Sequence, residues 1–219
     1  MVVRTAHQGA CPGGAGPQGR AIRYAEASVD DHADRALVAR TCEEILLSSG
    51  LADEAYARYG LEAHRAGTYL AWFRAVAKTY PHKQPDAILA DLVAHTPGEE
   101  GKWFAAAKDA GQFETAAALA LRSPCAPQTL ARAARDFAQE RPGFAIDAGF
   151  AALHWLLQGY GYEVTSTDVL EAYEHTMTAA ANAGRSDEMQ ERVGALLAGS
   201  GRQAEFVREV LALRLKARG

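Results

Sequence analysis

The clearest structural pattern in this chain of 219 residues is WFAAAKDAGQFETAAALA, residues 103–120. Its second half places four apolar residues at intervals of three and four: Phe113, Ala116, Ala117 and Ala120. Residues with that spacing lie on one face of an α-helix. Gly111 separates the two apolar stretches, and a glycine there can adopt the left-handed backbone conformation that ends a helix. The segment therefore predicts two helices joined by a tight turn.

The same helical spacing recurs along most of the chain. Further apolar stripes are Leu130, Ala133, Ala134 and Phe137, then Ile146, Phe150, Leu153 and Leu157, then Met189, Val193 and Leu196. No segment alternates apolar and polar residues with β-branched enrichment, as a half-buried strand would. We therefore predict an all-α fold, with helices near residues 31–48, 51–64, 67–79, 85–95, 98–109, 112–122, 127–140, 143–158, 166–182, 186–198 and 202–216.

Helix start signals agree with these stripes. Thr96 and Glu99 have the spacing of a capping box, in which the threonine hydroxyl accepts a hydrogen bond from an early helical N–H. Pro97 suits the first helical position after that cap. Thr165 and Asp168 offer a similar start. Because the connections are short, we expect sequential helices to be antiparallel neighbours.

Three predicted turns share a glycine followed by an acidic helix start. They are SGLADEA at 49–55, AGQFETA at 110–116 and AGRSDEM at 183–189. These turns resemble the middle of a tetratricopeptide repeat, and Gly111, Phe113 and Ala116 match its glycine, aromatic and alanine positions. The glycines are not separated by multiples of the repeat length of about 34 residues, so the resemblance is to a degenerate repeat. It implies an irregular α-solenoid of antiparallel helix hairpins.

A looser resemblance covers residues 51–199. This part is similar to the carboxy-terminal helical part of an uncharacterised bacterial domain-of-unknown-function family. The segments that carry the similarity are LADEAYARYGLEAHRAGTYL, KTYPHKQPDAILADLV, TPGEEGKWFAAAKDAG and GYGYEVTSTDVLEAYE. The resemblance implies no known activity, and it suggests that the chain is a short relative or a fragment of a longer protein.

The amino-terminal part differs in composition from the rest. Residues 1–28 are rich in Gly and small residues and poor in large apolar side chains, so they predict a flexible tail. Residues 29–219 are then the helical-hairpin repeat domain.

Charge and cysteine content exclude several classes of protein. With 23 basic and 27 acidic residues, the net charge of -4 predicts no general attraction to nucleic acid or membrane. No apolar run is long enough for a signal peptide core or a membrane span. Three widely spaced cysteines, Cys11, Cys42 and Cys125, argue against a disulfide framework and for a reducing compartment, so we expect a cytoplasmic protein.

Motifs of catalysis, metal binding and cofactor binding are not recognisable in the sequence. No two of the seven histidines have the helical spacing of a zinc site, and no glycine-rich phosphate loop is present. Cys42 falls in an apolar stripe and predicts a buried thiol, whereas Cys125, between Pro124 and Ala126, could be exposed. The adjacent acids Glu43 and Glu44 predict solvated side chains. We therefore expect no catalytic residue, metal or cofactor.

One group of basic and aromatic residues could bind a ligand. It comprises Lys78, Tyr80, His82, Lys83, Lys102 and Trp103. Cations beside aromatic rings suit an acidic peptide or a phosphate. The alternative is structural: the cations complement a helix C-terminus, Tyr80 packs inward, and Trp103 anchors the core. We expect the structural role.

These observations predict a non-catalytic protein-interaction or scaffold module with a protein or peptide partner, bound on the concave face of stacked hairpins. Two alternatives stay open. The first is an enzyme whose pocket is assembled from distant residues, which would require three or more titratable side chains converging in one deep pocket. The second is a fragment that needs a missing amino-terminal domain.

Overall fold

The computed structural model describes residues 16–27, 35–65, 67–161, 163–199 and 202–216. Every regular element in these ranges is a helix, which confirms the predicted all-α class. The chain divides into two compact units, Met1–Gln84 and Pro85–Gly219, where the sequence predicted one continuous array after residue 28. No described helix is both long enough and apolar enough to cross a lipid bilayer.

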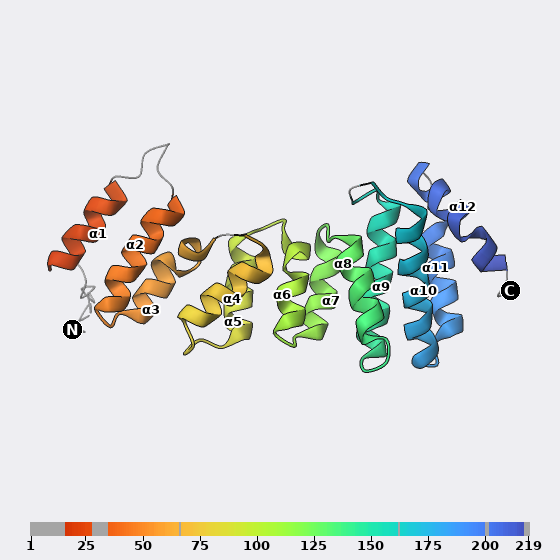
Figure 1. Ribbon diagram of the computed structural model, residues 1–219, viewed down its shortest axis with the longest axis horizontal. Coiled ribbons are helices and arrows are strands. Elements are labelled where there is room, and N and C mark those ends of the chain that lie inside the picture. The colour runs from red at the N-terminus through yellow and green to blue at the C-terminus, as the bar shows by residue number, and fades with distance from the viewer. Residues whose placement is uncertain (1–15, 28–34, 66, 162, 200–201, 217–219) are drawn as a thin grey trace, which may run out of the picture. The chain divides into compact units, whose positions relative to one another are not determined.

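Figure 1 shows the helices in chain order. Unit 1 contains α1 (Pro17–Ala27), α2 (Arg35–Ser48), α3 (Ala52–Ala55), the π-helix η1 (Tyr56–Gly60), the 3₁₀-helix η2 (Glu62–His64) and α4 (Tyr69–Thr79). Unit 2 contains α5 (Pro85–His95), the 3₁₀-helix η3 (Glu100–Trp103), α6 (Phe104–Asp109), α7 (Phe113–Arg122), α8 (Pro127–Phe137), α9 (Pro142–Leu157), α10 (Ser166–Asn182), α11 (Ser186–Leu197) and α12 (Arg202–Lys216).

Part of the predicted tail is helical. Residues 17–27 form α1, which packs on α2 and buries Ile22 to 3% exposure. Glu26 accepts hydrogen bonds from Arg58 at 2.9 Å and from the Tyr59 hydroxyl at 2.5 Å. These distant contacts, which composition does not reveal, stabilise the helix. The remainder of the predicted tail, residues 1–15 and 28, lies outside the described residues.

The predicted helix 51–64 is replaced by a short α-helix, a π-helix and a 3₁₀-helix. The ring of Tyr80 packs directly against Gly60, where an added Cβ would lie 2.9 Å from that ring. The guanidinium of Arg40 donates to the carbonyl of Ala63. Both contacts join residues far apart in the chain. The change from one α-helix to three short helices was therefore not visible in the helical periodicity of the sequence.

The two predicted capping boxes had opposite outcomes. At α10, the Thr165 hydroxyl accepts from the Asp168 amide and the Asp168 carboxylate accepts from the Thr165 amide, as predicted. At Thr96 the prediction is wrong, because that hydroxyl donates to the Leu92 carbonyl at 3.0 Å and accepts from the indole of Trp103 at 2.7 Å. The predicted helix 98–109 accordingly starts as η3 and continues as α6.

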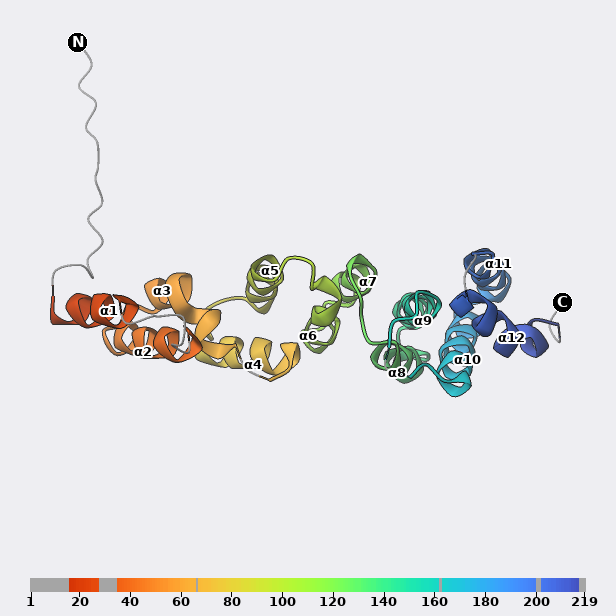
Figure 2. The ribbon, with the colours of Figure 1, turned by 90° about the horizontal axis from the view of Figure 1, so that it is seen from above.

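Close helix packing forms the core of unit 2. Figure 2 shows α5, α7, α9 and α11 in one row and α6, α8 and α10 in the other. Where α9 meets α10, a Cβ on Gly149 would lie 2.1 Å from the Thr176 hydroxyl oxygen, so only glycine permits this approach. The turns at Gly111 and Gly184 have φ of 75° and 67°, the left-handed conformation expected of glycine at a helix end.

Candidate functional site

Three of the four predicted binding residues of unit 1 are engaged within that unit: Tyr80, His82 and Lys83. Tyr80 is fully buried, and its hydroxyl donates to Glu43 at 2.5 Å. Asp53 Oδ1 lies 2.8 Å from Lys83 Nζ and 3.4 Å from His82 Nε2. The Lys83 ammonium also lies 5.0 Å from the centre of the Tyr56 ring. Two of the basic side chains expected to meet a ligand, His82 and Lys83, therefore already face the Asp53 carboxylate.

Lys78 is exposed on α4. Lys102 and Trp103 belong to the other unit. Lys102 Nζ lies 2.6 Å from Glu99 Oε1. The side chain of Trp103 is fully buried, which confirms the predicted core role. The six predicted residues are thus divided between the two units and form no single site within either.

A buried polar cluster in unit 1 was missed by the sequence reasoning. Glu43, predicted to be solvated, is 2% exposed and accepts the hydroxyl hydrogen of Tyr80. His64 Nε2 lies 3.1 Å from the same carboxylate oxygen. Burial, followed by the hydrogen bond to Glu43, raises the pKa of Tyr80. The signal that could have revealed Glu43 is its place between Ala39 and Leu46 on the buried face of α2.

The three titratable groups Glu43, His64 and Tyr80 converge, but they do not line either of the clefts described below. The Glu43 carboxylate is enclosed, and the His64 side chain is 17% exposed. The enzyme alternative requires convergence in one deep pocket, and neither of the two described clefts contains this cluster. Within the described ranges, no three His, Cys, Asp or Glu side chains are placed to hold a metal ion.

Two cysteines of the described chain are free and buried. Cys42 is buried, as predicted from its apolar stripe. Cys125 is only 4% exposed, in contrast to the exposed thiol that its loop position suggested. Burial raises the pKa of Cys125 to about 12. Neither thiol is therefore poised to act as a nucleophile at neutral pH.

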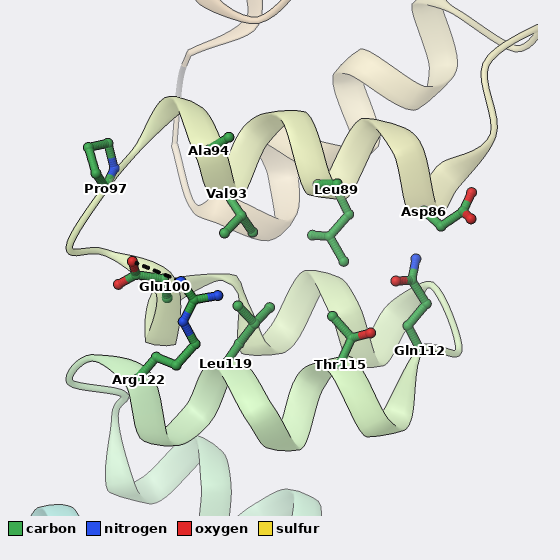
Figure 3. A pocket seen from close by; sticks show the side chains of 11 residues that line it. Asp86, Leu89, Val93, Ala94, Pro97, Glu100, Gln112, Thr115, Leu119 and Arg122 are labelled. Carbon is green, nitrogen blue, oxygen red and sulfur yellow. Dashed lines mark ion pairs between the residues drawn. The ribbon is translucent and has the colours of Figure 1, made fainter.

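A cleft of unit 2 lies between α5 and α7 (Figure 3) and has a volume of about 600 Å³. We call it the α5–α7 cleft. Its lining comprises Asp86, Leu89, Ala90, Val93, Ala94, Pro97, Glu100, Gln112, Thr115, Leu119 and Arg122. The α5 residues among them recur every three or four positions, as do those of α7, so each helix contributes one face.

The middle of the α5–α7 cleft is mainly apolar, and Thr115 contributes its one polar side chain. Leu89 and Leu119 are 1% and 4% exposed. Ala90 and Ala94 on α5 are exposed beside them. The cleft thus combines a closed apolar floor with a wall of small side chains that is open to solvent.

Charged groups occur only towards the ends of the α5–α7 cleft. Asp86 and Gln112 mark one end, and Glu100 and Arg122 mark the other (Figure 3). The Arg122 guanidinium lies 3.6 Å from the Glu100 carboxylate, with side chains 59% and 15% exposed. Hydrogen bonds from the backbone amides of Glu100 itself and of Gly98 hold the pKa of Glu100 below its usual value. Arg122 is therefore the accessible charge at this end.

A smaller cleft of about 470 Å³ lies at the α10–α11 turn. It is lined by Met177, Thr178, Ala181, Asn182, Ser186, Asp187 and Gln190. The Asn182 amide donates to the Ala138 carbonyl at 2.8 Å, so this side chain holds α10 against the end of α8. The Asn182 side chain therefore has a structural role.

The sequence reasoning did not identify the α5–α7 cleft. A signal was present in PDAILADLVAH, residues 85–95, whose apolar residues are spread around the helix and not gathered on one face. Ile88, Leu89 and Leu92 account for its buried residues, yet Ala90 and Ala94 add apolar surface that faces solvent. Comparison of the chain with protein-family models, characterised proteins and solved structures gave no match.

Proposed function

We propose that this chain is a non-catalytic protein-interaction module that binds a segment of a partner protein in the α5–α7 cleft. The observation that carries the proposal is the combination of an apolar floor, Leu89 and Leu119, with an accessible apolar wall, Ala90 and Ala94. A mainly apolar concave surface with charged groups only near its ends suits recognition of a protein segment.

The lining chemistry favours binding over catalysis. No serine, cysteine or histidine lines the α5–α7 cleft, and its ionisable groups stand near its ends. Asp86 and Arg122 lie at opposite ends of the cleft, so they cannot act together on one reacting atom. The buried cluster around Glu43 belongs to the interior of unit 1, where it holds α2, η2 and the end of α4 together.

We also propose that unit 2 is an irregular α-solenoid of the tetratricopeptide-like kind. The two rows of helices in Figure 2 and the glycine turns at Gly111 and Gly184 support this interpretation. In such an array, helices of one row line the binding surface, and α5 and α7 share a row. A reducing compartment such as the cytoplasm, in which the buried thiols of Cys42 and Cys125 stay free, is part of the proposal.

The test is a selection of random peptides of about 16 residues, displayed on phage, with the full chain as bait. Binders are then measured against two variants of α5, Ala90→Arg and Ala87→Arg. Both alanines are exposed on the same helix, but only Ala90 lines the cleft. We expect Ala90→Arg to weaken binding at least about tenfold, or 1.4 kcal/mol, and Ala87→Arg to leave it unchanged. Failure to obtain binders, or binders indifferent to Ala90→Arg, would refute the proposal.

A further inference from the structure

The α5–α7 cleft has a direction, because its two walls run the same way. Asp86 and Gln112, at the starts of α5 and α7, lie at one end of the cleft in Figure 3. Arg122, at the end of α7, and Pro97, just after α5, lie at the other end. The partial positive charges of both helix N-termini therefore lie at the Asp86 end, and the partial negative charges of both C-termini lie at the Arg122 end. Any partner with its own dipole experiences a preferred orientation.

The lining also distinguishes a helical from an extended partner. An extended segment brings backbone N–H and C=O groups that need hydrogen-bond partners once water is removed. Apart from the Thr115 hydroxyl, the middle of the cleft offers only apolar side chains, among them Leu89, Val93 and Leu119. A helical partner satisfies its own backbone internally and presents only side chains. The apolar middle therefore favours a helix.

The dimensions fit a short helix. At about 1.5 Å per residue, the ten residues of α7 span about 15 Å, the length of about three helical turns. Side chains at i, i+3 or i+4, and i+7 of a partner helix follow the same spacing as the residues of the two walls. Because Ala90 and Ala94 are small, the partner can approach α5 closely and place larger apolar side chains over Leu89 and Leu119.

Charge at the two ends agrees with the dipole argument. Helices commonly carry acidic residues in their first turn and basic residues in their last turn. Arg122, 59% exposed, suits the acidic first turn of a partner. Asp86, exposed in the first turn of α5, suits a basic last turn. Both pairs form only if the partner runs antiparallel to α5 and α7.

We propose that the α5–α7 cleft binds an amphipathic helix of about three turns, antiparallel to α5 and α7, with its acidic first turn at Arg122 and its basic last turn at Asp86. The inference rests on the proposed function and specifies the chemistry of the partner. It predicts that peptides selected on the full chain share an apolar i, i+3 or i+4, i+7 pattern between an acidic start and a basic end.

Orientation is tested with a selected peptide that carries a nitroxide spin label at one end. We expect a label at the peptide N-terminus to broaden the NMR amide signal of Arg122, and a label at its C-terminus to broaden that of Gln112. Arg122→Glu should weaken binding about three- to fivefold, because an exposed ion pair contributes up to about 1 kcal/mol. Replacing the acidic residues of the peptide by lysine should restore binding to the Arg122→Glu variant. Lys102→Glu, at an exposed residue outside the cleft, is the control and should leave binding unchanged.

The outcomes separate the two proposals. Peptides that need Ala90 but lack helical periodicity, or that broaden the two signals in the reverse order, overturn the antiparallel helix and leave the interaction function standing. Peptides that bind independently of Ala90 overturn both.

Discussion

Replacement of Trp103 tests whether a single side chain anchors the start of unit 2. The indole is fully buried between the end of α5 and the start of α6, and its N–H donates to Thr96 at 2.7 Å. A tryptophan buries about 150–250 Å², which at about 25 cal/mol per Å² gives an upper bound of about 4–6 kcal/mol. We expect Trp103→Ala to lower the free energy of unfolding by about 3–5 kcal/mol.

Two further variants separate packing from hydrogen bonding. Trp103→Phe keeps an aromatic ring but loses the indole donor, so we expect a loss of about 1.5–2.5 kcal/mol. Thr96→Val removes the acceptor and leaves the buried indole N–H without a partner, at a cost of about 1–3 kcal/mol. The double variant should cost less than the sum of the two, because both changes remove the same hydrogen bond.

The assay is urea unfolding followed by far-UV circular dichroism, which does not depend on the fluorescence of the replaced residue. Lys102→Ala is the matched control, since Lys102 is the exposed neighbour, and its effect should stay within about 0.5 kcal/mol. An unfolding midpoint of Trp103→Ala or Trp103→Phe equal to that of the unaltered chain would contradict the anchoring role.

Three other outcomes can be checked with simple variants. Gly149→Ala should destabilise the chain by about 1–3 kcal/mol, because its Cβ would meet the Thr176 hydroxyl. Gly194→Ala, inside α11 with open space around the added Cβ, should instead stabilise the chain by about 0.5–1 kcal/mol. Equal unfolding midpoints of the two variants would contradict the close packing of α9 on α10. The pKa of Tyr80 is raised in the folded chain. The contribution of Tyr80 to the free energy of unfolding is therefore complete below the unfolded pKa of about 10 and is lost as pH rises through the folded pKa. Over that range the free energy of unfolding falls by up to about 1.4 kcal/mol per pH unit. Alkaline unfolding measured by circular dichroism should therefore be less steep in Tyr80→Phe, and an identical pH profile would argue against the raised pKa. The third outcome concerns a chain in which Cys11 and Cys42 are replaced by serine, so that only the Cys125 thiol remains. This thiol should react with a thiol reagent at pH 8 on the order of a hundredfold more slowly in the folded chain than in urea. Equal rates would show that the Cys125 thiol is accessible in the folded chain.

The sequence by itself determined the features that depend on neighbouring residues. Apolar stripes at helical spacing placed α8 and α11, and the short distance between Thr165 and Asp168 correctly predicted the capping box of α10. The glycine turn at Gly111 followed from the conformational freedom of glycine at a helix end. Each of these features forms within a few residues, so its physical cause is written in the local sequence.

Only the tertiary structure decided the features that need a distant partner. Thr96 has the same capping pattern as Thr165, yet the Trp103 indole and the Leu92 carbonyl occupy its hydroxyl. Glu43 is buried because Tyr80 and His64 reach its carboxylate from elsewhere in unit 1. The α5–α7 cleft depends on how far apart two helices pack, which is set by side chains between them and not by the period of either helix. Local propensity fixes where helices form, whereas burial of polar groups and the shape of a cleft depend on contacts between residues far apart in the chain.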